Sequence, residues 1–257
     1  MTHALPRTRA ADDAAFSLFQ RVRSSGRFDF ASPVADPRFA LATKYAPFGQ
    51  GIMAGVLLAS DSAGHVHTLR AFSGQLNGAW LVDGWAPPLC TFRHDTSHAY
   101  RLTVRRIVAL GAPARAAAAE AKADALRGAS DARDAAARAA SARKAQQAVS
   151  RALSARIWAS YAVRNWRGEV RGLPGAAGAA APCGGTGDCA APKLLNMAHA
   201  MGLRPLSMAE MWIGGPPPGG GKAEGTLYPA CVERCEPILG YMLCGLQDGA
   251  PKAGGGR

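Results

Sequence analysis

The sequence contains no run of eighteen or more apolar residues, and its first sixteen residues hold no apolar stretch like that of a secretory signal peptide. The first absence excludes a transmembrane helix, and the second leads us to expect an intracellular, cytoplasmic protein without a membrane partner. Arg and Ala near the start leave an organellar transit peptide as an alternative. Asp12 and Asp13 argue against it, because transit peptides are poor in acidic residues.

Acidic residues are scarce: the chain has 18 Asp and Glu against 30 Lys and Arg, a net charge of +12. Most of the excess lies between Arg101 and Arg171, where 15 basic and 5 acidic residues give a net charge of +10. A concentrated basic segment favours a polyanionic partner, RNA or DNA first. A solvated helix face in an Arg-biased composition is the alternative, and the sequence leaves both open.

A run of apolar residues rich in Val, Leu and Ile predicts a buried strand at 51–60, and alternating residues predict a second strand at 65–74. The turn signal at 61–64 joins the two into a β-hairpin. A third strand is predicted at 206–214, and a short helix at 11–24. Helices and strands are mixed along the chain. We therefore expect an α/β (α+β) fold with a central sheet and packed helices.

Glycine is nearly absent from 113–163, an Ala- and Arg-rich segment in which Gly128 stands alone. Because Ala is the best helix former, this segment is predicted to be a long inserted helix, or a helical hairpin broken near Gly128. Val149, Leu153, Ile157 and Tyr161 recur every four residues and form one apolar stripe. Four basic side chains lie largely off this stripe and are the candidate RNA-binding residues: Arg143, Lys144, Arg151 and Arg156.

The composition changes along the chain predict five segments. These are an N-terminal tail and short helix at 1–35, the hairpin part of the core at 36–110, a basic helical insertion at 111–165, a Cys-bearing helix–strand–helix at 166–247, and a disordered tail at 248–257.

Six cysteines without a signal peptide indicate metal ligands rather than a disulfide framework. Cys189 lies at the predicted start of one helix, and Cys231 and Cys235 lie in the first turns of another. A helix N-terminus lowers the pKa of a thiol, and residues four apart on a helix share a face. Three cysteine ligands would leave one tetrahedral position of a zinc ion open, as catalytic zinc sites do.

Neighbouring residues support these helix starts. Asp188 is a candidate N-cap, Pro192 suits a first turn, and the second helix is predicted to follow Pro229. Cys183, in a Gly-rich run, is an alternative fourth ligand that would close the site and make it structural. Buried free thiols that only fill a core are the alternative to a metal site.

The order of hairpin, helix with a cysteine, strand, and helix with two cysteines resembles the zinc nucleobase deaminases, whose signature is H/C-A-E followed by P-C-x-x-C. The resemblance implies Cys189, Cys231 and Cys235 as zinc ligands. This chain departs from the signature in two ways, because its pair is C-x-x-x-C and because Ala191 occupies the position of the catalytic glutamate.

A second resemblance covers roughly 51–246. The phrases GTGDCAAPKLLNMAHAMGLRPLSMAEMWIGG and LYPACVERCEPILGYML, with GWAPPLC and SRALSARIWASYAVRNWRGE, are similar to the N-terminal accessory region of long-form RluA-like pseudouridine synthases. The H-R-L-D catalytic motif of those enzymes is absent. The resemblance implies an RNA-modification context, with tRNA or rRNA and a separate RNA-modifying synthase as partners, and without pseudouridine synthase activity in this chain.

Glu210 lies on the predicted strand LSMAEMWIG, on the same face as Met208 and Trp212. An apolar setting raises the pKa of a carboxyl and suits it to general acid work, so Glu210 is the candidate catalytic residue in place of the missing glutamate. The alternative is a structural glutamate that pairs with an arginine or caps a backbone N–H.

Three functions follow from these patterns. The first is a zinc-binding, RNA-associated accessory domain without catalysis. The second is a zinc-dependent nucleobase deaminase-like hydrolase, with Glu210 or Asp188 as the proton carrier. The third is a structural protein-docking domain that uses the Ala-rich helix as its arm.

Overall fold

A computed structural model describes residues 5–41, 51–90, 98–127, 132–178, 182–217 and 219–247. The chain divides into two compact units, and we describe each by itself. The core unit comprises Met1–Cys90 and Tyr161–Arg257, and the helical unit comprises Thr91–Ser160. The tail predicted at 248–257 lies outside the described residues.

The core unit is built on a four-stranded sheet in the order β2-β1-β5-β6, with every neighbouring pair antiparallel. Its strands are β1 (Ile52–Ser60), β2 (Val66–Phe72), β5 (Arg204–Ile213) and β6 (Leu227–Tyr228). The hairpin of β1 and β2 and the strand β5 confirm the three sequence predictions. The fold is thus a mixed α+β arrangement around an antiparallel sheet.

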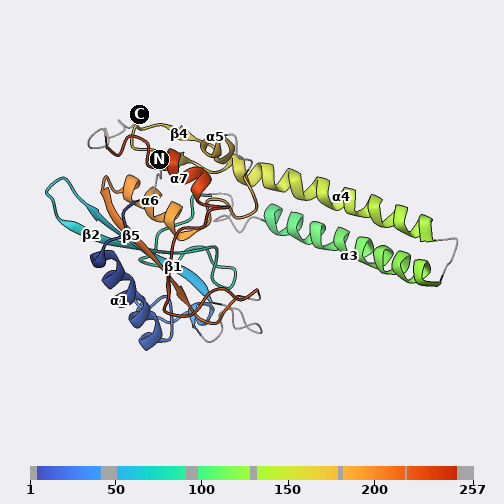
Figure 1. Ribbon diagram of the computed structural model, residues 1–257, viewed down its shortest axis with the longest axis horizontal. Helices are drawn as coiled ribbons and strands as arrows, with labels where there is room; N and C mark the ends of the chain where they lie inside the picture. The colour runs from blue at the N-terminus through green and yellow to red at the C-terminus, as the bar shows by residue number, and fades with distance from the viewer. Residues whose placement is uncertain are drawn as a thin grey trace. The chain divides into compact units, whose positions relative to one another are not determined.

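Helices cover both faces of this sheet (Figure 1). Helix α1 (Arg9–Ser25) packs on one face with Ala11, Leu18 and Val22 buried, and α6 (Ala190–Ala200) packs on the other. The central strand β1 is therefore buried on both sides. This double burial explains why its sequence is a continuous apolar run instead of an alternating one.

Gly55 brings α6 close to the sheet. A Cβ at this position of β1 would lie 3.1 Å from Cβ of Ala190, 3.2 Å from Cγ of Glu210 and 3.2 Å from Cδ1 of Leu194. Such distances are tighter than ordinary van der Waals contact, so a larger residue would push the helix away. The absent side chain places the start of α6 directly beside Glu210.

The helical unit is a hairpin of α3 (His98–Arg127) and α4 (Ala132–Ala159). Gln146 Nε2 donates to the Ile107 carbonyl over 3.2 Å, and Arg138 pairs with Glu120 at 3.2 Å. The hairpin alternative is therefore the correct one, although α3 begins well before the expected start at 113. The predicted break near Gly128 falls in 128–131, outside the described residues.

Two further predictions need correction. The Gly-, Ala- and Pro-rich composition of 173–187 predicts a flexible connection. The structure has a short helix there, α5 (Leu173–Ala177), after the small ribbon of β3 (Val163–Arg164) and β4 (Val170–Arg171). The last helix, α7 (Glu236–Met242), starts later than Pro229. Among the helices of the described residues, none is both long and apolar enough to cross a membrane.

Candidate metal centre

Cys189 is placed by the segment that leads into α6. It occupies the N-cap position itself, and its side chain makes no capping hydrogen bond. The predicted cap, Asp188, is instead buried, and its Oδ1 accepts a 2.5 Å hydrogen bond from the Tyr161 hydroxyl. The Asp188 carbonyl also accepts from the Gly74 N–H at 2.8 Å. These bonds fix the backbone before Cys189.

Cys231 and Cys235 are brought together by a turn before α7, not by a helix that contains both. The N–H groups of Cys235 and Glu236 donate to the Cys231 carbonyl at 3.1 and 3.2 Å, which closes one turn. The four-residue spacing therefore brings the two sulfurs together as predicted, but through a turn instead of a helix. Cys235 is the N-cap residue of α7.

The sulfur atoms of Cys189, Cys231 and Cys235 converge. Cys231 Sγ lies 3.5 Å from Cys189 Sγ and 3.2 Å from Cys235 Sγ, and the three ligand atoms all lie within 4.8 Å of one another. A zinc–sulfur bond of about 2.3 Å in a tetrahedron separates two sulfurs by about 3.8 Å. Small changes in side-chain torsion therefore suffice for the three cysteines to hold one metal ion.

The three thiols differ in acidity, contrary to the expectation that a helix start lowers each pKa. Hydrogen bonds from Cys189 and Cys235 lower the pKa of Cys231, which lies between them. The hydrogen bond with Cys231 raises the pKa of Cys189, and hydrogen bonds with both neighbours, together with burial, raise that of Cys235. Thiol-to-thiol hydrogen bonding thus outweighs the helix termini and concentrates negative charge on Cys231.

The remaining cysteines lie outside this group. Cys183 Sγ contacts Thr186 Oγ1 at 3.4 Å and the Glu233 carbonyl at 3.7 Å, and among the described residues it is not part of the converging set. Cys90 is fully buried and Cys244 is half-buried. All six cysteines are free thiols. The structure therefore gives no support to Cys183 as a fourth ligand.

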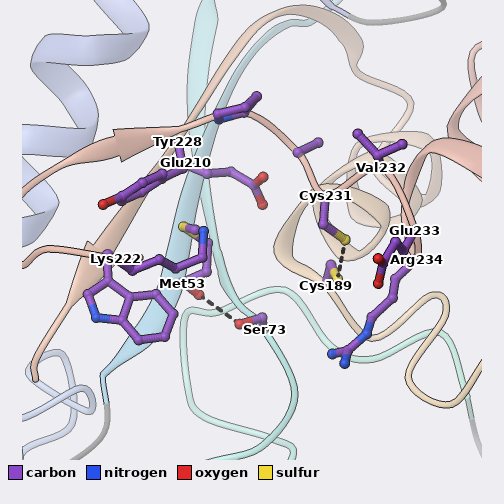
Figure 2. A pocket seen from close by; sticks show the side chains of 13 residues that line it. Met53, Ser73, Cys189, Glu210, Lys222, Tyr228, Cys231, Val232, Glu233 and Arg234 are labelled. Atoms are coloured by element: carbon purple, nitrogen blue, oxygen red, sulfur yellow. Dashed lines mark hydrogen bonds between the residues drawn. The ribbon is translucent and has the colours of Figure 1, made fainter. Parts of the chain in front are cut away.

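Glu210 faces the same place from the sheet. It lies opposite Gly55 of β1 and beside Tyr228 of β6 in the strand register, and its side chain is only 5% exposed. In Figure 2 its carboxylate points across the pocket toward Cys231. Its oxygens are not among the converging ligand atoms. Glu210 is thus placed next to the sulfur group and not within it.

Burial raises the pKa of Glu210 to about 7, and the negative charge of Cys231 acts in the same direction. A hydrogen bond from the backbone N–H of Ala191 and the charge of Lys222 oppose the rise. Glu210 therefore reaches the backbone of the residue at which the deaminase signature has its glutamate. A carboxyl with this pKa exists in both protonation states near neutral pH.

A pocket of about 560 Å³ opens in front of these groups (Figure 2). Cys189, Cys231 and Glu210 form part of its wall, together with Met53, Ser73, Trp212, Lys222, Tyr228 and residues 229, 230 and 232–234. Lys222 Nζ lies 4.0 Å from the ring centroid of Tyr228 and 5.7 Å from that of Trp212. The volume suits a small organic molecule, and aromatic and cationic groups are the ones available to bind it.

The four candidate RNA-binding residues lie in the other unit, exposed on α4. At 100° per residue, Lys144 and Arg151 project from nearly the same side of the helix. Arg156 lies about 140° around the axis from Arg151. The structure therefore keeps all four in solvent but does not gather them on a single face.

The wall residues that the sequence analysis did not single out include Lys222, Tyr228 and Arg234. Arg234 lies inside the Cys-x-x-x-Cys motif, so the motif itself could have suggested it. Lys222 and Tyr228 come from a Gly- and Pro-rich loop and from a two-residue strand, and neither has a sequence signal. The pairing of β6 with β5 places Tyr228 beside Glu210, and Lys222 lies against the Tyr228 ring.

No protein-family model, curated protein or solved structure matches the chain. The converging cysteines, the buried carboxyl of Glu210 and the pocket between them are therefore the observations on which its function has to be argued.

Proposed function

We propose that the core unit is a zinc-dependent, deaminase-like hydrolase that acts on a nucleobase, with Glu210 as its proton carrier. The observation that carries the proposal is the buried Glu210 carboxyl, which points across a pocket toward Cys231, one of three cysteines whose sulfurs converge. Ala191 occupies the position of the catalytic glutamate in the deaminase signature, which by itself favours an accessory domain without catalysis. Glu210 of β5 accepts a hydrogen bond from the Ala191 N–H, so a carboxyl is nevertheless available beside this position.

Zinc is the metal that the ligand set favours. Thiolates are soft ligands that select zinc over magnesium, calcium or manganese, and Cys₃ sets occur in the zinc deaminases. When bound, zinc supplies a Lewis acid with one coordination position left open to the pocket. Cys189, Cys231 and Cys235 would hold it, and the low pKa of Cys231 favours its thiolate for this purpose.

The order of the elements supports a deaminase-like fold. The chain runs from the β1–β2 hairpin to α6, whose N-cap is the first cysteine, and then to β5 beside β1. The cysteine pair follows directly before α7. Cys189 and Cys235 thus occupy the N-caps of two helices, and Cys231 lies in the turn before the second, an order similar to that of the deaminase signature.

Glu210 performs the proton transfer in this proposal. Its Oε atoms can take a proton from water in the pocket and return it to a leaving amine, because the carboxyl faces the pocket and burial favours its protonated form. The Ala191 N–H holds the carboxylate in place. Trp212 and Tyr228 offer flat apolar surfaces of the kind on which nucleobases stack.

Glu210→Gln should lower the rate of ammonia release from a nucleobase substrate by about 100-fold or more, since it removes the proton carrier but keeps the shape. The assay uses the zinc-loaded chain with cytosine- and adenine-containing nucleosides and RNA oligonucleotides. Cys183→Ser is the matched control and should retain activity. Full activity in Glu210→Gln would refute the role of this residue.

A wild-type chain that binds zinc but releases no ammonia from any of these substrates would favour a second candidate, the RNA-associated accessory domain. Its support is the exposed basic surface of α4 and the resemblance to the accessory region of RluA-like pseudouridine synthases. In that role the metal would stabilise the fold, and tRNA or rRNA would contact the helical unit.

Replacing Arg143, Lys144, Arg151 and Arg156 together by Gln should then weaken RNA binding and flatten its salt dependence. Each lost phosphate contact lowers the slope of log K against log salt by about 0.7–0.9. Fluorescence anisotropy with a labelled RNA at several salt concentrations measures the slope. Arg138→Gln is the control, because Glu120 already balances that charge, and an equal effect of both variants would count against the assignment.

A further inference from the structure

We infer that the core unit has a second ligand site, on the face of the sheet opposite the cysteines, that binds a small organic phosphate monoester. A pocket of about 400 Å³ lies there between α1 and the strands. Arg21 of α1 and Arg70 of β2 stand in its wall. This inference does not depend on the proposed hydrolase, because no residue of the metal centre takes part.

The two arginines converge on one aromatic ring. The guanidinium carbon of Arg21 lies 4.8 Å from the ring centroid of Phe30, and that of Arg70 lies 4.7 Å from it. Arg70 also lies 5.6 Å from the ring centroid of Trp85. The rings hold both guanidinium groups by cation–π contact, so the two positive charges stay close together.

No acidic residue neutralises this pair in the part of the chain that the structure describes. The ion pairs of α1 use its other arginines: Arg9 pairs with Asp13 and Arg23 with Glu224. Burial, together with the like charge of Arg21, lowers the pKa of Arg70. Two uncompensated cations at the wall of one pocket attract an anion.

Arg70 also has an unused donor. Its Nε is buried and has no hydrogen-bond partner among the described residues. Its Nη2 lies only 2.2 Å from where a Cβ of residue 84 would be, so Gly84 is what gives the guanidinium its space. Buried charged donors without partners are costly and uncommon, and a bound anion would satisfy this one.

The lining decides the class of anion. Two guanidinium forks match the geometry and the double negative charge of a phosphate monoester. The Ser17 and Thr68 side chains add hydroxyl groups at the wall, and Ala14, Leu18 and Val56 add apolar surface. A volume of about 400 Å³ exceeds the needs of a bare phosphate ion and admits an attached organic group.

Phenyl phosphate is the probe, because it carries a phosphate monoester and no nucleobase that the metal pocket would bind. We expect phenyl phosphate to shift the Arg70 Nε–H resonance in ¹H–¹⁵N spectra of the full chain, whereas phenol leaves it unchanged. Arg21→Gln and Arg70→Met should each weaken binding by about tenfold or more, measured by isothermal titration calorimetry because Arg70→Met lacks the reporting resonance. Arg9→Gln, an exposed position of the same helix, should bind like the wild type.

Three results would overturn the inference. These are equal binding of phenol and phenyl phosphate, unchanged binding in both arginine variants, and loss of binding in Arg234→Gln with retention in Arg21→Gln. The last result would place the ligand in the metal pocket. Arg21 is exposed, so Arg21→Gln tests the site even if Arg70→Met fails to fold.

Discussion

Cys231→Ser should reduce the zinc content of the purified chain from about one ion to nearly none. Cys231 lies between the other two sulfurs and has the lowered pKa, so its loss removes both a ligand and the main negative charge of the group. Serine replaces it poorly, because a hydroxyl does not ionise as a thiol does. We expect zinc affinity to fall by more than about 100-fold, measured by competition with a chromogenic chelator.

The matched control is Cys183→Ser, which changes a cysteine outside the converging group and should keep full zinc content. Chelation of the wild-type chain gives an independent measure. An ion present at about 1,000 times its Kd contributes about 4 kcal/mol to the free energy of unfolding, which corresponds to roughly 8–16 °C in Tm. Equal zinc content in the wild type and the Cys189→Ser, Cys231→Ser and Cys235→Ser variants would contradict the metal centre.

The second large effect is expected for Lys193→Met. Lys193 of α6 is fully buried, and its Nζ donates to the carbonyls of Phe72 and Gly74, each at 2.8 Å. It also lies 4.7 Å from the ring centroid of Phe72 and 5.6 Å from that of Trp80. Methionine keeps most of the volume but leaves two carbonyls without their donor, so we expect unfolding to become easier by about 2–4 kcal/mol.

Urea denaturation measures this change, and Lys222→Met is the control because Lys222 is only half-buried and contacts the rings of Tyr228 and Trp212 instead of donating to buried carbonyls. The control should cost less than about 1 kcal/mol. The two carbonyls flank Ser73, a wall residue of the metal pocket, so Lys193→Met should also disturb that wall. A Lys193→Met chain as stable as the wild type would show that burying this charge costs as much as its bonds return.

Local patterns were sufficient to predict the main elements. The apolar runs of β1 and β5, the turn between β1 and β2, and the Ala-rich helices all depend on residues close in sequence. The three metal-ligand candidates were also found this way, because cysteines next to helix-start signals are rare enough to be noticed. Glu210 was noticed for the opposite reason, as a carboxyl among apolar neighbours.

Element boundaries were predicted less well, because they depend on competing partners. Asp188 is a residue type that often forms an N-cap, but its carboxylate accepts a hydrogen bond from the Tyr161 hydroxyl, and Cys189 is the N-cap residue of α6. The Cys231–Cys235 segment has helical spacing but forms only a turn before α7. The starts of α6 and α7 were thus set by a contact from elsewhere in the fold or by the geometry of the next element.

By itself, the sequence determined the mixed fold class, the basic helical segment and the three cysteines whose sulfurs converge. Only the tertiary structure decided that Glu210 of β5 points toward Cys231, and that Arg21 and Arg70 line one pocket on the other face of the sheet. The physical reason is that periodicity reports which side of an element is buried. Which groups meet across a pocket depends on strand pairing and on close approaches such as the one at Gly55.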